Sequence, residues 1–150
     1  MRGVLIGVVA AVAVLGVAGA VAVPEAKEWY DGRHEQTSSY ATGKEAKKAR
    51  ESVPRWLPDD AASVEYAMRT TGGERILKAT LRDGRLPAQC EPLGGKNAPD
   101  PEISASWFPS GTASSAQGRC GSYYVSLEDH TLYAWQTNGD WVAENRRSAQ

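Results

Sequence analysis

The chain has 150 residues and a formal net charge of −1, with 17 basic and 18 acidic side chains. This balance gives no overall attraction to nucleic acid, which normally needs a basic surface, so we expect no nucleic-acid partner. The length leaves room for one small domain beside an apolar amino-terminal segment.

The apolar segment Val4–Val23 contains no charged, polar or aromatic side chain. As a helix it would span about 30 Å, which matches the hydrocarbon core of a bilayer. We predict that residues 1–23 form a transmembrane signal-anchor, with the lipid bilayer as the partner of residues 4–23. The protein is then a single-pass protein of the cell membrane.

Two further interpretations of this segment stay open. Small residues at 18–20 and 20–22 fit a signal-peptidase site, so cleavage near 20–22 would give a secreted protein. The pairs Gly3/Gly7 and Gly16/Ala20 have the small-xxx-small spacing of helix contacts, which allows weak helix–helix self-association.

Residues 24–53 contain few aliphatic side chains and no period-two alternation, which predicts a polar, partly helical stalk. Thr42 and Glu45 fit a capping box, so a helix is expected to begin after Thr42. Pro54 limits its continuation. We place the folded domain at 54–143 and a disordered tail at 144–150.

Alternation of apolar and polar side chains predicts the strands of this domain. They cover 64–69, 75–81, 103–107, 122–128, 131–135 and 140–143. Gly72-Gly73 and Asn138-Gly139 are hairpin-turn signals. The predicted fold class is an amino-terminal transmembrane helix plus a small mainly-β or α+β domain. Its sheet is expected to be an antiparallel meander of five or six strands.

The chain has two cysteines, Cys90 and Cys120, and neither lies in a CxxC motif. An even count in a small exported domain favours one disulfide, so we place the domain outside the cytoplasm. Two buried thiols in a cytosolic domain are the alternative. A zinc site from these cysteines and His130 lacks the usual ligand spacing, so no metal or other cofactor is expected.

Sequence motifs for catalysis are missing. The chain has no HExxH, GxSxG, Walker, GxGxxG or SxxK motif. Both histidines lie outside a candidate site, His34 in the predicted stalk and His130 in a turn. The carboxylate pairs Asp59-Asp60 and Asp100/Glu102 sit beside prolines, where turn chemistry explains them. We therefore expect no enzyme.

Three aromatic side chains share the predicted outer face of the last hairpin: Tyr124, Tyr133 and Trp135. If the Val125 side chain faces the core, the alternation along the strand places Tyr124 on the opposite face of the sheet. Two arrangements remain open. The rings form a binding face for sugar or peptide, or the excursion 82–102 folds over them and makes a second small core.

The segments RWLPDDAASVEYAMRTTGGERIL and LYAWQ resemble single-span envelope proteins of Gram-positive actinobacteria that carry no assigned activity. This resemblance covers about residues 54–137 and implies an envelope location. The expected function is non-enzymatic binding of an envelope protein or cell-wall polymer. The alternatives are an accessory subunit that packs through its transmembrane helix, and a small extracytoplasmic enzyme.

Overall fold

The computed structural model describes residues 34–150. The predicted anchor Val4–Val23, its cleavage site and its self-association motif lie outside the described residues. Within residues 34–150, no helix combines the length and the apolar character that a membrane crossing requires.

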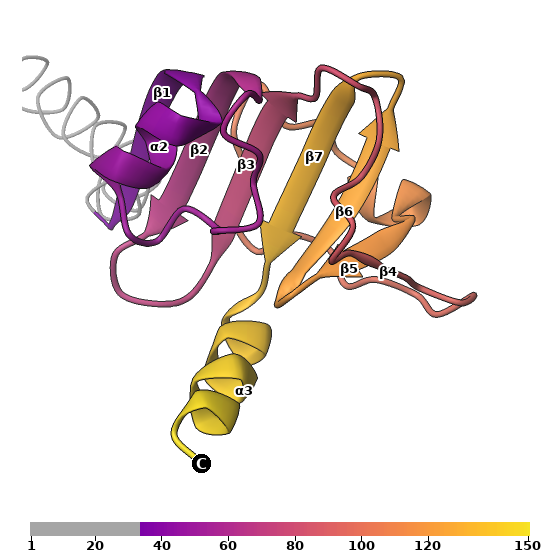
Figure 1. Cartoon of the computed structure of the whole chain (residues 1–150). Coiled ribbons are helices and arrows are strands. Elements are labelled where there is room, and N and C mark those ends of the chain that lie inside the picture. The colour runs from indigo at the N-terminus through magenta and orange to yellow at the C-terminus, as the bar shows by residue number, and fades with distance from the viewer. Residues whose placement is uncertain (1–33) are drawn as a thin grey trace, which may run out of the picture. The chain divides into compact units, whose positions relative to one another are not determined.

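A single antiparallel sheet forms the centre of the domain (Figure 1). Its seven strands follow the order β1-β2-β3-β7-β6-β5-β4. They are β1 Glu35–Thr42, β2 Ala62–Arg69, β3 Arg75–Thr80, β4 Glu91–Pro92, β5 Gly118–Cys120, β6 Tyr123–Glu128 and β7 Thr131–Gln136. The prediction of a small, mainly-β antiparallel domain is confirmed, but the sheet has seven strands where five or six were predicted. The sheet is two meanders joined where β3 pairs with β7, because the segment after β3 leads to the far edge.

The hairpins β2–β3 and β6–β7 form at the predicted positions. Tyr66 lies opposite Leu77, and Val125 lies opposite Ala134. All four of these side chains are buried. The alternation in the sequence therefore indicated the correct inward face of both hairpins.

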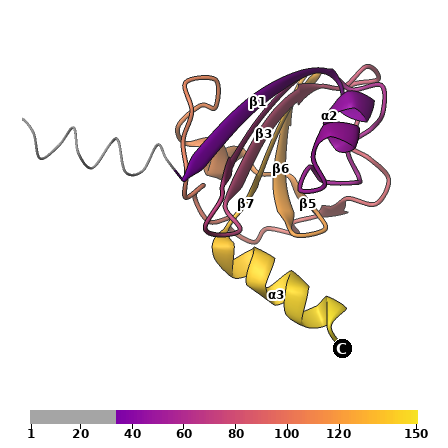
Figure 2. The ribbon, with the colours of Figure 1, turned by 90° about the vertical axis from the view of Figure 1, so that its left-hand side faces the viewer.

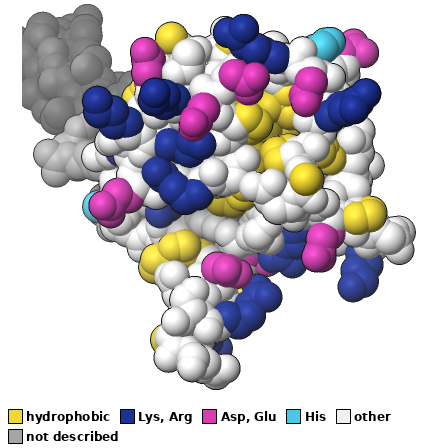
Figure 3. Space-filling view, viewed as in Figure 1, with side chains coloured by type: hydrophobic (Ala, Val, Ile, Leu, Met, Phe, Trp, Pro, Cys, Tyr) yellow, Lys and Arg dark blue, Asp and Glu magenta, His cyan; other side chains and the backbone are white. Residues whose placement is uncertain are grey.

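The main core lies on the sheet face that α2 (Gly43–Ala49) covers (Figure 2). The Thr42 side chain accepts a hydrogen bond from the Glu45 backbone N–H at 3.1 Å, so the predicted cap begins this helix. Ala46 and the following Leu57 are fully buried against the strands. Figure 3 views this face, where hydrophobic side chains reach the surface between charges of both signs.

A second core covers the opposite face of the sheet. Its buried members are Ala67, Ile76, Ile103, Phe108, Tyr133 and Trp135. The loop that carries Ile103 and Phe108 lies against β3 and β7, together with η1 (Thr112–Ser115). The predicted strand 103–107 is therefore wrong, since this segment is an irregular cover bounded by Pro101 and Pro109.

The predicted stalk is wrong from residue 35 onward. Residues 35–42 form β1, which pairs with β2 along its whole length, and Glu35–Gln150 is one compact unit. The strand lacks an apolar alternation because it is an edge strand whose side chains are half-buried or exposed. Residues 24–33 of the predicted stalk lie outside the described residues.

The carboxyl-terminal prediction also needs correction. In place of a strand at 140–143 and a disordered tail at 144–150, the chain forms α3, Asn138–Ser148. Thr137 accepts a hydrogen bond from the Asp140 backbone N–H at 3.1 Å, and its hydroxyl donates to the Asp140 carboxylate at 2.6 Å. This cap directs Asn138-Gly139 into a helix instead of a hairpin turn.

The predicted disulfide is present. Cys90 and Cys120 are bonded, with a Cα–Cα distance of 4.2 Å and a sequence separation of 30. Cys120 is fully buried at the end of β5. The bond attaches the long segment after β3 to the sheet next to the β4–β5 edge.

Candidate functional site

The predicted binding face divides into covered and accessible rings. Trp135 is fully buried and Tyr133 nearly so, and the Phe108 ring packs edge-on against both. The Trp135 indole N–H donates to the Pro99 carbonyl at 2.8 Å. The binding-face alternative therefore does not hold for these two rings, which the second core covers. The cover comes mainly from residues 98–116, rather than from 82–102.

Tyr124 is the half-exposed member of the three rings. One face of its ring stacks on Trp135 with a centroid separation of 6.0 Å. The Arg119 guanidinium lies over the ring at 4.6 Å from its centroid. Arg119 and Trp135 are the cross-strand neighbours of Tyr124 on β5 and β7, so the ring is flanked by both and offers a ligand its edge and hydroxyl.

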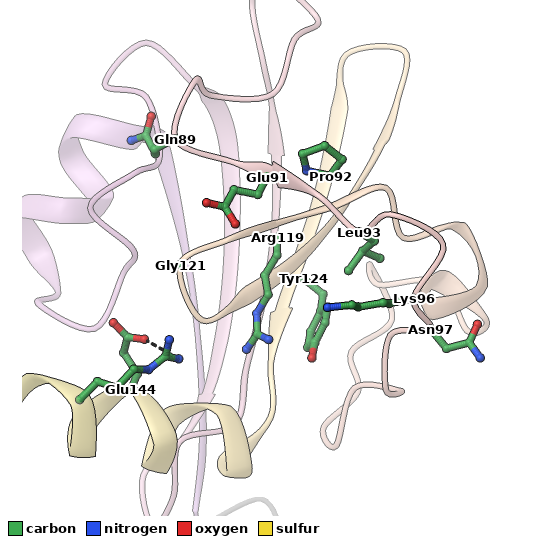
Figure 4. A pocket seen from close by; sticks show the side chains of 11 residues that line it. Gln89, Glu91, Pro92, Leu93, Lys96, Asn97, Arg119, Gly121, Tyr124 and Glu144 are labelled. Atoms are coloured by element: carbon green, nitrogen blue, oxygen red, sulfur yellow. Dashed lines mark ion pairs between the residues drawn. The ribbon is translucent and has the colours of Figure 1, made fainter.

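An open cavity of about 540 Å³ lies beside Tyr124, between the β4–β5 edge and α3 (Figure 4). The loop after β4 forms one wall, and Figure 4 shows Lys96 reaching from it toward Tyr124. Arg119 of β5 lies on the other side of the tyrosine. The lining residues used below are Glu91, Lys96, Arg119, Tyr124, Glu144 and Arg147.

Arg119 is fixed by α3. Its Nη2 lies 2.7 Å from the Asp140 carboxylate, which in turn accepts the Thr137 hydroxyl of the helix cap. This ion pair and the contact with the Tyr124 ring hold the guanidinium plane in one orientation. The cap of α3 therefore also sets the geometry of this wall of the cavity.

The charges of the cavity are only partly paired. Arg119 pairs with Asp140, and Arg147 lies 3.2 Å from Glu144. Lys96 and Glu91, in contrast, have no ion-pair partner within residues 34–150, and both are exposed. The cavity thus presents one uncompensated cation and one uncompensated carboxylate.

The disulfide joins two walls of this cavity. Gln89 and Glu91 flank Cys90 in the sequence, and Arg119 and Gly121 flank Cys120. All four flanking residues line the cavity. Sequence reasoning predicted the bond but missed these residues, although a disulfide necessarily brings the neighbours of its cysteines together.

Several of the other residues considered in the sequence make local structural contacts. The Nδ1 of His130 lies 2.9 Å from the Leu81 carbonyl oxygen, and both cysteines are used in the disulfide. Asp59 pairs with Lys47 at 2.7 Å, and Glu102 accepts the Asn138 N–H at 2.7 Å. In the described part of the chain, no three histidine, cysteine or carboxylate side chains converge on a possible metal site.

Comparison with known proteins gives no assignment: no family model, no curated protein and no solved structure matches this chain.

Proposed function

We propose that this protein is a non-enzymatic binding module of the cell envelope. Residues 4–23 hold it in the membrane, and the domain takes an envelope protein segment or wall polymer into the cavity beside Tyr124. The observation that supports this proposal most directly is the pairing pattern of the cavity, in which only Lys96 and Glu91 are left uncompensated.

The two uncompensated charges favour a ligand that carries both an amino group and a carboxylate. Lys96 would attract the carboxylate, and Glu91 would attract the amino group. The Tyr124 hydroxyl and the outer edge of Arg119 add hydrogen-bonding groups whose positions are already fixed. Peptide segments and the peptide cross-links of bacterial walls have this combination of charges.

Co-sedimentation with purified peptidoglycan sacculi of a Gram-positive bacterium tests the proposal. We expect the full-length protein to bind, and Lys96→Glu or Glu91→Lys to weaken binding about tenfold or more, since each places like charges at the contact. Lys48→Glu is the matched control, because Lys48 is exposed on α2 and does not line the cavity.

If the ligand is a protein instead of a wall polymer, the proposed site is the same and a different binding assay is needed. If sacculi do not bind, the same variants are compared in a pull-down from solubilised membranes. A partner that is lost with Lys96→Glu but kept with Lys48→Glu supports the cavity. Binding that neither Lys96→Glu nor Glu91→Lys weakens contradicts the proposed site. A partner that remains after deletion of residues 35–150 instead supports packing through the amino-terminal segment.

A further inference from the structure

The two edges of the sheet differ in how they are protected. β4 has two residues and ends in Pro92, which has no backbone N–H to donate. A short edge strand with a proline is a common protection against strand addition. β1 at the opposite edge has 8 residues, with neither proline nor lysine among them. Its pairing with β2 continues from Glu35 to Thr42 without a register shift.

In the described part of the chain, no strand pairs with the outer side of β1. Every second residue of an antiparallel edge strand directs its N–H and C=O away from its neighbour. Among the described residues, the backbone of 35–41 forms no hydrogen bond outside its ladder with β2. An extended segment could therefore add to this edge through main-chain hydrogen bonds.

Side chains hold β1 in a fixed position. Arg50 donates to Gln36 at 2.9 Å and to the Tyr40 hydroxyl at 3.2 Å on the α2 side. Ser39 donates to the Glu65 carboxylate at 2.6 Å on the other side. The edge is therefore ordered before any partner binds, which lowers the entropy cost of pairing.

We propose that β1 pairs antiparallel with β1 of a second copy of this chain, so that the two sheets join into one across a twofold axis. A twofold normal to the sheet keeps opposed side chains on the same face, so the central pair is Ser39 opposite Ser39 of the second copy, with Ser38 opposite Tyr40 and Gln36 opposite Thr42. Glu35 is the only charged residue of β1, so no like charges meet across this interface.

The composition of β1 favours a second copy over an unrelated peptide. A twofold interface must be complementary to itself. The hydroxyl side chains at the centre of β1 form pairs with one another in this register, and such cross-strand pairs are favourable. Anchoring in one bilayer, which rests on the proposed function, would confine the copies to a common plane. The pairing itself does not depend on the cavity.

The mass of the full-length protein in detergent, measured by light scattering across a concentration series, tests this interface. We expect a dimer whose dissociation constant rises about tenfold or more in Ser39→Lys, since the twofold brings the two introduced ammonium groups close together. In the monomer the introduced lysine can pair with Glu65, so the variant is expected to fold. The control is Ser110→Lys, because Ser110 is an exposed residue of the loop over the opposite core.

Hydrogen exchange of the amides of 35–42 gives a second measurement. We expect exchange to slow as the wild-type protein associates, and to stay fast in Ser39→Lys. A wild-type monomer at all concentrations would overturn the proposal, as would a dimer that Ser39→Lys leaves intact. Amides of 35–42 that are all protected in the monomer would also overturn it, because they would show the edge covered by the same chain.

Discussion

At the scale of single residues, Trp135 is the centre of the second core. It is fully buried, packs against Phe108 and Tyr124, and donates its indole N–H to Pro99. We expect Trp135→Ala to lower the free energy of unfolding by about 3–5 kcal/mol, since it leaves a large cavity and an unpaired carbonyl. Denaturant unfolding measures this. Trp141→Ala, at a tryptophan that is 38% exposed, is the control and should cost far less.

The Tyr123 side chain predicts that the stability of the fold depends on pH in the alkaline range. Burial raises the pKa of Tyr123 well above its usual value, and burial also raises the pKa of Tyr66. A tyrosine whose pKa is higher in the folded state than the unfolded value of about 10 contributes to stability below that pH. This contribution is lost as the pH rises through the folded-state pKa. Stability should therefore decline above about pH 10.

The variant Tyr123→Phe isolates this effect. It keeps a ring at the edge-on contact with Trp56, at a centroid distance of 5.7 Å, and removes the ionisable hydroxyl. We expect the urea midpoint of the variant to fall less between about pH 8 and pH 11 than that of the wild type. Tyr66 keeps part of the dependence. Equal losses in both proteins would contradict the role assigned to Tyr123.

At the scale of elements, the disulfide is the connection between stability and the cavity. A bridge over a separation of 30 residues is expected to stabilise the fold by about 3–4 kcal/mol in the chain-entropy model. We expect the double variant Cys90→Ser/Cys120→Ser to lower the free energy of unfolding by a similar amount. It should also weaken ligand binding in the sedimentation assay at temperatures where the variant is still folded, because Glu91 and Arg119 lose their common attachment. Unchanged binding would show that α3 alone holds the cavity.

The elements that the sequence predicts well are those whose side chains alternate between a core and a surface. β2, β3, β6 and β7 are central strands, so their alternation and turn residues agree with their places in the sheet. β1 is an edge strand whose residues are half-buried or exposed, and its polar sequence resembles a stalk. Residues 103–107 alternate without a partner strand, because they cover a sheet face instead of joining the sheet.

The start of α3 shows how two local signals compete. Asn138-Gly139 favours a hairpin turn, whereas Thr137 and Asp140 have capping-box spacing. Two tertiary contacts support the capped helix: the Asn138 side chain accepts the Gly73 N–H at 2.9 Å, and the Trp141 side chain packs on Gly73. Those tertiary contacts cannot be read from the local sequence. The cavity was missed for the same reason, since its walls come from β4, β5, β6, the loop after β4 and α3.

At the scale of the whole molecule, the disulfide and the apolar segment Val4–Val23 bear on the same proposal, that the protein is anchored in a membrane with its domain outside the cytoplasm. A structural disulfide persists in oxidising compartments outside the cytoplasm. α3 ends at Ser148 on an exposed surface, so a short epitope tag after Gln150 should not disturb the fold. We expect this tag to be accessible to antibody on intact cells, and the protein to sediment with membranes. Labelling that requires lysis would contradict export. A mature amino terminus near residues 21–23 would instead identify a cleaved signal and a secreted protein, with the same domain outside the cell.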